Sequence, residues 1–126
     1  MNYKGSIIEE SLSKADVLKN MVIVKTRKEK ATAEYKTPWL TQWTHHTIEI
    51  PESKIDITAA LLSRSFDMNH PSWYIDFKND KYHFIIFPKK IFKVNLKSPI
   101  LYKNARKYGE SLGIPSSQMQ FERLKR

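Results

Sequence analysis

The 126-residue sequence contains no cysteine, only three glycines and no long run of apolar residues. Without cysteine, disulfide bonds, thiolate zinc sites and cysteine nucleophiles are all excluded. The scattered glycines leave no glycine-rich phosphate loop. No apolar stretch approaches the roughly 20 residues of a membrane span, and residues 1–16 lack the apolar core of a signal peptide. We therefore expect a cytoplasmic protein that does not associate with membranes.

Acidic residues are scarce in the last two-fifths of the chain. Residues 1–77 carry ten Lys or Arg and ten Asp or Glu, whereas residues 78–126 carry twelve cations and three acids. The whole net charge of +9 therefore lies in residues 78–126. Such asymmetry favours an anionic partner, either nucleic acid or an acidic protein surface. The alternative is a lysine-rich surface that serves solubility alone.

The length suits a single domain, residues 1–126, that can bury a core. Residues 21–50 are predicted to form a long antiparallel hairpin with an irregular tip, because MVIVKT is rich in β-branched residues and residues 39–50 alternate. In that alternation Ile48 and Ile50 face the core. Residues 1–16 are polar with few apolar anchors, so a loosely ordered arm is expected there.

Three further strands follow the hairpin: SWYIDF (72–77), YHFIIF (82–87) and IFKVNL (91–96). A two-residue turn at 79–80 would place Asp76 opposite His83 and gather the apolar side chains on one face. A three-residue loop at 88–90 would then keep Lys93 away from the core. A two-residue loop there would turn Lys93 inward, which the cost of burying a charge disfavours.

Two helices are predicted, over residues 54–66 and 99–112. The first carries apolar residues at helical spacing, and the second begins after Ser98 and ends before Gly113. Residues 116–126 form a C-terminal extension with one more short helical turn. The predicted fold is α+β, in two layers: a five-stranded, mostly antiparallel sheet with two helices packed on one face, in the order β-β-α-β-β-β-α.

The adjacent histidines His45 and His46 raise the question of a metal site. Neighbouring residues of a strand point to opposite faces, so the two rings cannot share one metal without a kink. His46 shares its face with Ile48 and Ile50, which indicates a hydrogen-bonded position at the edge of the core. No other ligand set suits zinc, so we predict no metal and no cofactor.

The predicted register gives one catalytic hypothesis. On the face away from the core, Asp76 lies opposite His83, and His83 lies opposite Asn95. Such a row would hold the histidine in one tautomer for acid–base chemistry. The alternative is a polar ladder on the surface, and no serine or threonine is placed beside it as a nucleophile. A non-enzymatic protein is therefore favoured.

The leading hypothesis is a binding or regulatory module whose basic C-terminal half contacts an anionic partner such as nucleic acid. The candidate contacts are Lys89, Lys93, Lys97, Lys103, Arg106 and Lys107. Cations of this kind would dock on phosphates through charge, with steep salt dependence. The sequence has no RNA-recognition aromatic motif, so this prediction depends on charge alone.

A second hypothesis is a protein-interaction or oligomer-forming domain. Trp39, Trp43 and the segment IIEESL (7–12) would then dock on a partner. The tryptophans suit packing better than base stacking, because no lysine lies between Trp39 and Glu49.

Six segments form a recognisable set: GSIIEESL (5–12), TPWLTQW (37–43), HTIEIPE (46–52), WYIDFKNDKYHFIIF (73–87), KIFKV (90–94) and YGESLGIP followed by Gln118 (108–118). Together they carry a resemblance to a family of small conserved bacterial proteins of unknown function. It covers nearly the whole chain, and the set is more specific than any single segment. It implies a bacterial cytoplasmic protein and supplies no catalytic residues.

Overall fold

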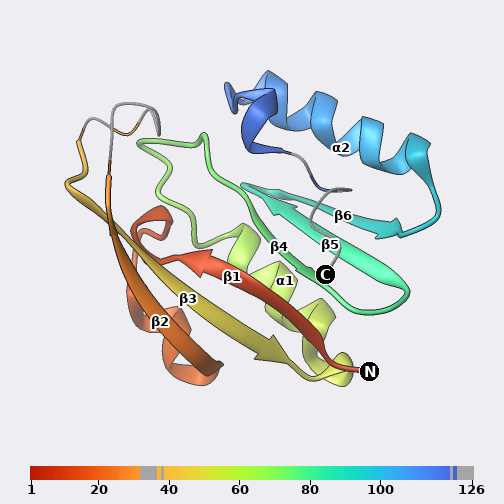
Figure 1. Ribbon diagram of the computed structural model, residues 1–126, viewed down its shortest axis with the longest axis horizontal. Coiled ribbons are helices and arrows are strands. Elements are labelled where there is room, and N and C mark those ends of the chain that lie inside the picture. The colour runs from red at the N-terminus through yellow and green to blue at the C-terminus, as the bar shows by residue number, and fades with distance from the viewer. Residues whose placement is uncertain (32–36, 38, 120, 122–126) are drawn as a thin grey trace.

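The computed structural model describes residues 1–31, 37, 39–119 and 121, which form an α+β fold with an open antiparallel sheet and two α-helices (Figure 1). The elements in chain order, with η marking short 3-10 helices, are β1 (Tyr3–Ile8), η1 (Glu9–Ser11), η2 (Ala15–Asn20), β2 (Val22–Lys30), β3 (Gln42–Ile50), η4 (Glu52–Lys54), α1 (Ile55–Ser63), β4 (Ile75–Lys78), β5 (Tyr82–Phe87), β6 (Lys90–Asn95), α2 (Pro99–Ser111) and η5 (Ser116–Gln118). The α+β class predicted from the sequence is confirmed.

The sheet has six strands in the order β2-β3-β1-β4-β5-β6, and all neighbours are antiparallel. The prediction of five strands was wrong, because residues 3–8, taken as part of a loose arm, form the inner strand β1 (Figure 1). Tyr3 and Ile7 anchor this strand in the core. Gly5 stands between them, where an added Cβ would lie 2.0 Å from the carbonyl oxygen of Asp76. This glycine hides the strand pattern in the sequence.

The two helices pack on opposite faces of the sheet. One core joins α1 to Phe84 and Ile86 and extends over β1 and β3. A second core joins α2 to Ile85 and Phe87. Consecutive residues of β5 therefore alternate between two cores, and the strand is buried on both faces. The prediction of two layers with both helices on one face was wrong, since the apolar run of β5 serves both faces.

Helix α2 begins as predicted, and α1 is shorter than predicted. The N–H of Leu101 donates to Ser98 Oγ at 3.3 Å, which caps α2. Helix α1 ends at Ser63, three residues before the predicted end. The hydroxyl of Ser63 donates to the carbonyl oxygen of Ala60 at 2.8 Å, where it competes with the helical pattern.

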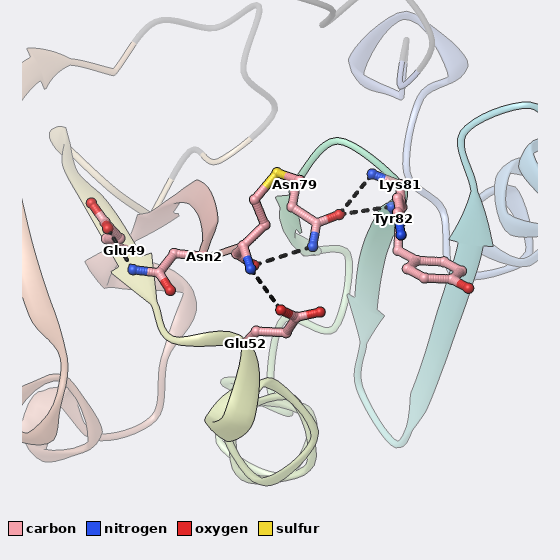
Figure 2. A network of polar contacts seen from close by, with 7 residues as sticks. Asn2, Glu49, Glu52, Asn79, Lys81 and Tyr82 are labelled. Atoms are coloured by element: carbon pink, nitrogen blue, oxygen red, sulfur yellow. Dashed lines mark hydrogen bonds and ion pairs between the residues drawn. The ribbon is translucent and has the colours of Figure 1, made fainter.

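The Asn79 side chain sets the turn between β4 and β5. Its Oδ1 accepts hydrogen bonds from the backbone N–H groups of Lys81 and Tyr82, each at 2.9 Å (Figure 2). The turn is therefore one residue later than predicted. The predicted pairing of Asp76 with His83 was wrong, because Asp76 lies opposite Ile85, two residues further along β5. Since the pairing differs by an even number of residues, the same side chains of β4 and β5 share each face as predicted.

The turn between β5 and β6 contains two residues, Pro88 and Lys89, so the predicted three-residue loop was wrong. Lys89 has a φ of 64°, in the left-handed region. Lys93 consequently lies opposite Phe84, on the α1 side of the sheet. Its Nζ stands 4.3 Å from the centroid of the Tyr82 ring, and the side chain remains exposed. The expected cost of burial does not arise, because β6 is an edge strand from which a lysine reaches water.

The hairpin predicted over residues 21–50 is confirmed as the antiparallel pair β2 and β3. Most of its predicted tip, residues 32–36, lies outside the described residues. In the C-terminal extension the predicted short turn is η5, and Met119 and Phe121 after it are buried in the α2 core. The remainder of that extension, residues 120 and 122–126, also lies outside the described residues.

Candidate functional site

On the α2 side, the sheet is hollowed over β1, β3 and β4. Lys4 and Ser6 of β1 point to this face, because Tyr3, Gly5 and Ile7 alternate toward the α1 core. Their cross-strand neighbours on β3 and β4 point the same way. The six polar side chains are Lys4, Ser6, Thr47, Glu49, Asp76 and Lys78, and all line a hollow of about 1100 Å³.

Two smaller hollows of about 280 Å³ each continue from the first. Ser6 and Asp76 line both the large hollow and the next one. Trp43 and Trp73, together with Ser72 and Gln118, line both of the smaller hollows. We call these three adjoining hollows the open-face groove. It changes from charged at the β1–β4 end to aromatic at the tryptophan end.

Asp76 links the groove to a buried polar chain. Asp76 Oδ2 lies 2.6 Å from Nε2 of His83, and Nδ1 of His83 lies 2.9 Å from the Tyr102 hydroxyl. The His83 side chain is 0% exposed, whereas that of Asp76 is 22% exposed. Because an ionised carboxylate only accepts hydrogen bonds, Nε2 donates to Asp76. The Tyr102 hydroxyl completes the hydrogen bonding of the ring at Nδ1.

The structure brings together two of the three residues in the catalytic hypothesis. His83 and Asp76 are in contact, diagonally across β4 and β5. Asn95 lies opposite Tyr82 and points to the other face of the sheet. The predicted row is therefore wrong at Asn95, because the two-residue turn moves β6 by one position. Tyr102 of α2 occupies the position that the row gave to Asn95.

Tyr74 closes one side of the groove against the C-terminal turn. Its hydroxyl donates to the carbonyl oxygen of Gln118 at 2.6 Å. Burial raises the pKa of Tyr74, and the nearby carboxylate of Asp76 raises it further. The phenol therefore keeps its proton and holds η5 to the sheet beside Asp76.

The wide end of the groove has a hydrogen-bonded rim, which Figure 2 shows from close by. Asn2 Nδ2 donates to Glu49 Oε2 at 2.8 Å, and Asn79 Nδ2 donates to the carbonyl oxygen of Met1 at 3.3 Å. The amino group of Met1 lies 2.6 Å from Glu52 Oε1, and this contact lowers the pKa of Glu52. Residues before β1 are thus tied to β3, to η4 and to the turn after β4.

The three tryptophans differ in exposure. Trp73 is buried, and its ring centroid lies 5.3 Å from that of the half-buried Trp43. The Trp43 Nε1–H donates to Thr37 Oγ1 at 3.0 Å. Trp39 is exposed and stacks on His70 with ring centroids 3.7 Å apart. Trp39 and Trp43, named in the docking hypothesis, both line the last hollow of the groove.

His45 and His46 point to opposite faces, as predicted. His45 Nε2 lies 2.9 Å from Glu29 Oε1. His46 is buried between Glu9 Oε1 at 2.7 Å and Thr26 Oγ1 at 2.9 Å. Within the described residues, no group of His, Cys, Asp or Glu is arranged to hold a metal ion.

The six predicted anion contacts do not converge on one surface. Lys93 lies on the α1 side of β6, beyond the turn that contains Lys89. Lys103, Arg106 and Lys107 belong to α2, which packs on the opposite side. Lys97 follows β6 at the edge of the sheet. None of these six residues lines the groove hollows described above.

Most of the polar groove residues were missed in the sequence. Lys4 and Ser6 were assigned to an arm, and Glu49 and Lys78 were given no role in a site. The alternation of Tyr3 and Ile7 with Lys4 and Ser6 was the available signal. Only Asp76, Trp39 and Trp43 had been singled out.

Comparison of the chain with protein-family models, with curated proteins and with solved structures gave no match. The resemblance to a bacterial family therefore stays a prediction. In the described part of the chain, neither α-helix is long and apolar enough to cross a membrane.

Proposed function

We propose that this protein is a non-enzymatic binding module that holds an extended polypeptide segment in the open-face groove. The observation that carries the proposal is the adjoining series of hollows. These run from the charged floor around Lys4 and Asp76 to the indoles of Trp43 and Trp73. A polypeptide offers charged and apolar side chains in sequence along one line, which matches that change in character.

Asp76 is the specificity-determining group of this proposal. One carboxylate oxygen is held by the buried His83, so the group has a fixed position at the junction of two hollows. A fixed carboxylate in a partly buried site favours a cationic partner such as the side chain of Lys or Arg. The hollow beside Trp43 and Trp73 suits an apolar or aromatic side chain a few residues further along the ligand.

The groove is a poor site for nucleic acid. Glu49, Asp76 and Asp80 lie among its lining residues and repel phosphates. Lys4 and Lys78 balance part of that charge without making the floor basic. The anionic partner predicted from the C-terminal cations would therefore bind elsewhere on the molecule.

Catalysis by His83 fits this geometry less well than binding. The imidazole is fully buried, and both nitrogens already have partners in Asp76 and Tyr102. A catalytic base must reach the proton it removes within hydrogen-bond distance. His83 therefore acts as a positioning residue for Asp76. The enzyme alternative requires Asp76 itself to act as the base.

The test is selection of ligands followed by mapping of the bound site. A phage-displayed library of random peptides is panned against the protein, and enriched peptides are titrated into labelled protein by NMR. We expect sequences with a basic residue and a nearby aromatic residue, and shifts of the β1, β3 and β4 amides. Enrichment of peptides whose shifts map to α1 or β6 would refute the groove assignment.

A matched pair of tryptophan substitutions gives the control. Ser6→Trp fills the centre of the groove from an exposed position, and Ile57→Trp adds the same side chain to the exposed side of α1. We expect Ser6→Trp to weaken peptide binding roughly tenfold or more and Ile57→Trp to leave it unchanged. Equal effects of the two variants would contradict the proposal.

A further inference from the structure

Among the described residues, β2 is the most exposed strand. Eight of its nine residues are exposed, and the remaining residue, Glu29, is partly buried. Val22 and Val24 are apolar and are 61% and 60% exposed. Among the described residues, β3 is the strand that pairs with β2, and no strand lies on the other side. The outward backbone N–H and C=O groups of β2 can therefore accept another strand.

The charges along this edge have one predominant sign. Lys25, Arg27, Lys28 and Lys30 stand against the single acid Glu29, which already contacts Arg27 and His45. Lys25 and Arg27 point to the groove face, and Lys28 and Lys30 point to the α1 face. A strand added at this edge meets cations on both of its faces. The two exposed valines lie at the start of the same edge.

From these observations we propose that the outer edge of β2 pairs with an extended acidic segment of a partner protein, which becomes a seventh strand of the sheet. Main-chain hydrogen bonds supply the pairing, and acidic side chains at successive positions meet the cations on the two faces. Apolar residues at one end of the segment cover Val22 and Val24. This surface is separate from the open-face groove and does not depend on its function.

A second copy of this chain is a poor occupant of the same edge. Two β2 strands placed side by side bring lysine and arginine of one copy against those of the other, and like charges directly opposite are destabilising. The bulge at Val24, where the register with β3 shifts, also bends the strand near its start. The cations that prevent pairing of identical copies are therefore also the groups that select an acidic partner.

The experiment uses as its probe a synthetic peptide of successive glutamates that ends in two valines, called the Glu-Val peptide, and NMR of the whole protein as the readout. We expect amide shifts along Val22–Lys30 and weaker binding at high salt, since exposed ion pairs are screened. The same peptide with N-methyl groups on alternate residues cannot form the backbone ladder, and we expect it not to bind. Equal binding of the methylated peptide would show a charged patch without strand pairing and would overturn the proposal.

A charge exchange identifies the cations involved. We expect Lys25→Glu with Lys28→Glu to weaken binding of the Glu-Val peptide roughly tenfold or more and to create binding of a Lys-Val peptide. Lys97→Glu with Lys103→Glu makes the same charge change near the opposite edge of the sheet and serves as the control. The proposal is overturned if the two double variants behave alike, if the Glu-Val peptide does not bind, or if light scattering and hydrogen exchange show that copies pair through β2.

Discussion

Strands β5 and β2 differ more in burial than any other pair in this sheet. Five of the six residues of β5 are buried, and both faces of that strand lie in a core. In β2 eight of nine residues are exposed. The half of the sheet around β5 has a helix on each face, whereas the half around β2 and β3 has a core on the α1 face only.

The residues that stabilise the fold and the residues proposed to bind partners therefore lie in different parts of the sheet. Apolar burial around β5 provides a rigid support, and the polar residues that face the groove and the β2 edge contribute little to the core. Asp76 stands at the border between the halves, because its carboxylate faces the groove while its partner His83 belongs to the α2 side. Substitutions on the two sides of this border should therefore have different consequences.

The largest predicted effect is the loss of a ring from β5. Phe87 is fully buried and contacts the rings of Phe92 and Tyr108 at 5.8 and 5.2 Å between centroids. Phe87→Ala should lower the free energy of unfolding in urea by about 3–5 kcal/mol. Val24→Ala in β2 should change it by less than about 0.5 kcal/mol. Similar losses for the two variants would remove the contrast between the strands.

Gly5→Ala should also destabilise the protein strongly, although it adds only a methyl group. The new Cβ would lie 2.0 Å from the backbone oxygen of Asp76 and 2.8 Å from the Phe77 ring, so β1 and β4 must separate. We expect a loss of about 3 kcal/mol, the upper part of the range for overpacking, in thermal unfolding. Ser6→Ala, the adjacent exposed position, is the control. An unchanged melting temperature for Gly5→Ala would show that the strands are further apart than described.

Removing the Tyr102 hydroxyl tests the polar chain at the border. Tyr102→Phe leaves Nδ1 of the buried His83 without its partner, which should cost about 1–3 kcal/mol in urea unfolding. A double-mutant cycle with Asp76→Asn should show coupling, because both residues hold the same imidazole. Additive losses would mean that the two contacts act independently.

The pH dependence of stability tests Tyr74. Its pKa is raised by burial, so the unfolded chain loses this proton at about pH 10 while the folded chain retains it. Above that pH the folded state binds more protons, and stability must fall as pH rises. Tyr74→Phe should therefore lose less stability than the wild type between about pH 8 and pH 11 in urea unfolding. Parallel curves for the two proteins would show that Tyr74 is not the group responsible.

The smallest predicted effect concerns the cations of α2. Lys103→Gln with Lys107→Gln should reduce retention on heparin at low salt, and should leave the free energy of unfolding unchanged within about 0.5 kcal/mol. The control, Lys19→Gln with Lys54→Gln, removes the same charge outside the basic region. Complete absence of binding by the wild type at low salt would count against an anionic partner for α2 and β6.

Sequence patterns predicted the parts of the fold in which one physical signal dominates. Alternation placed Ile48 and Ile50 in the core, and Ser98 followed by proline marked the start of α2. The register of β4 against β5 was harder to predict. The prediction placed residues 79–80 in the turn, whereas the Asn79 side chain holds a turn that lies one residue later. The prediction that Lys93 points away from the core failed, because it counted the cost of burying a charge without considering that β6 is an edge strand.

The candidate site was less accessible than the fold. The contact of His83 with Asp76 survived the error in register, because a shift of two residues in the pairing leaves both side chains on one face. Tyr102 could not be found by strand geometry, since it comes from a helix on the side predicted to face solvent. Lys4 and Ser6 required recognition of β1, whose glycine and short apolar pattern resemble a loop.

The position of β1 between β3 and β4 has a consequence for how the chain is made. This strand is synthesised before either of its neighbours, yet it is the one that joins the hairpin of β2 and β3 to the meander of β4, β5 and β6. It can pair with β3 once the hairpin has emerged, but its other edge must wait for residues 75–78, which are far from it along the chain. Closure of the sheet is therefore a late and slow event in folding. In a nascent chain stopped after β3, strand β1 has a partner strand on one of its two edges only.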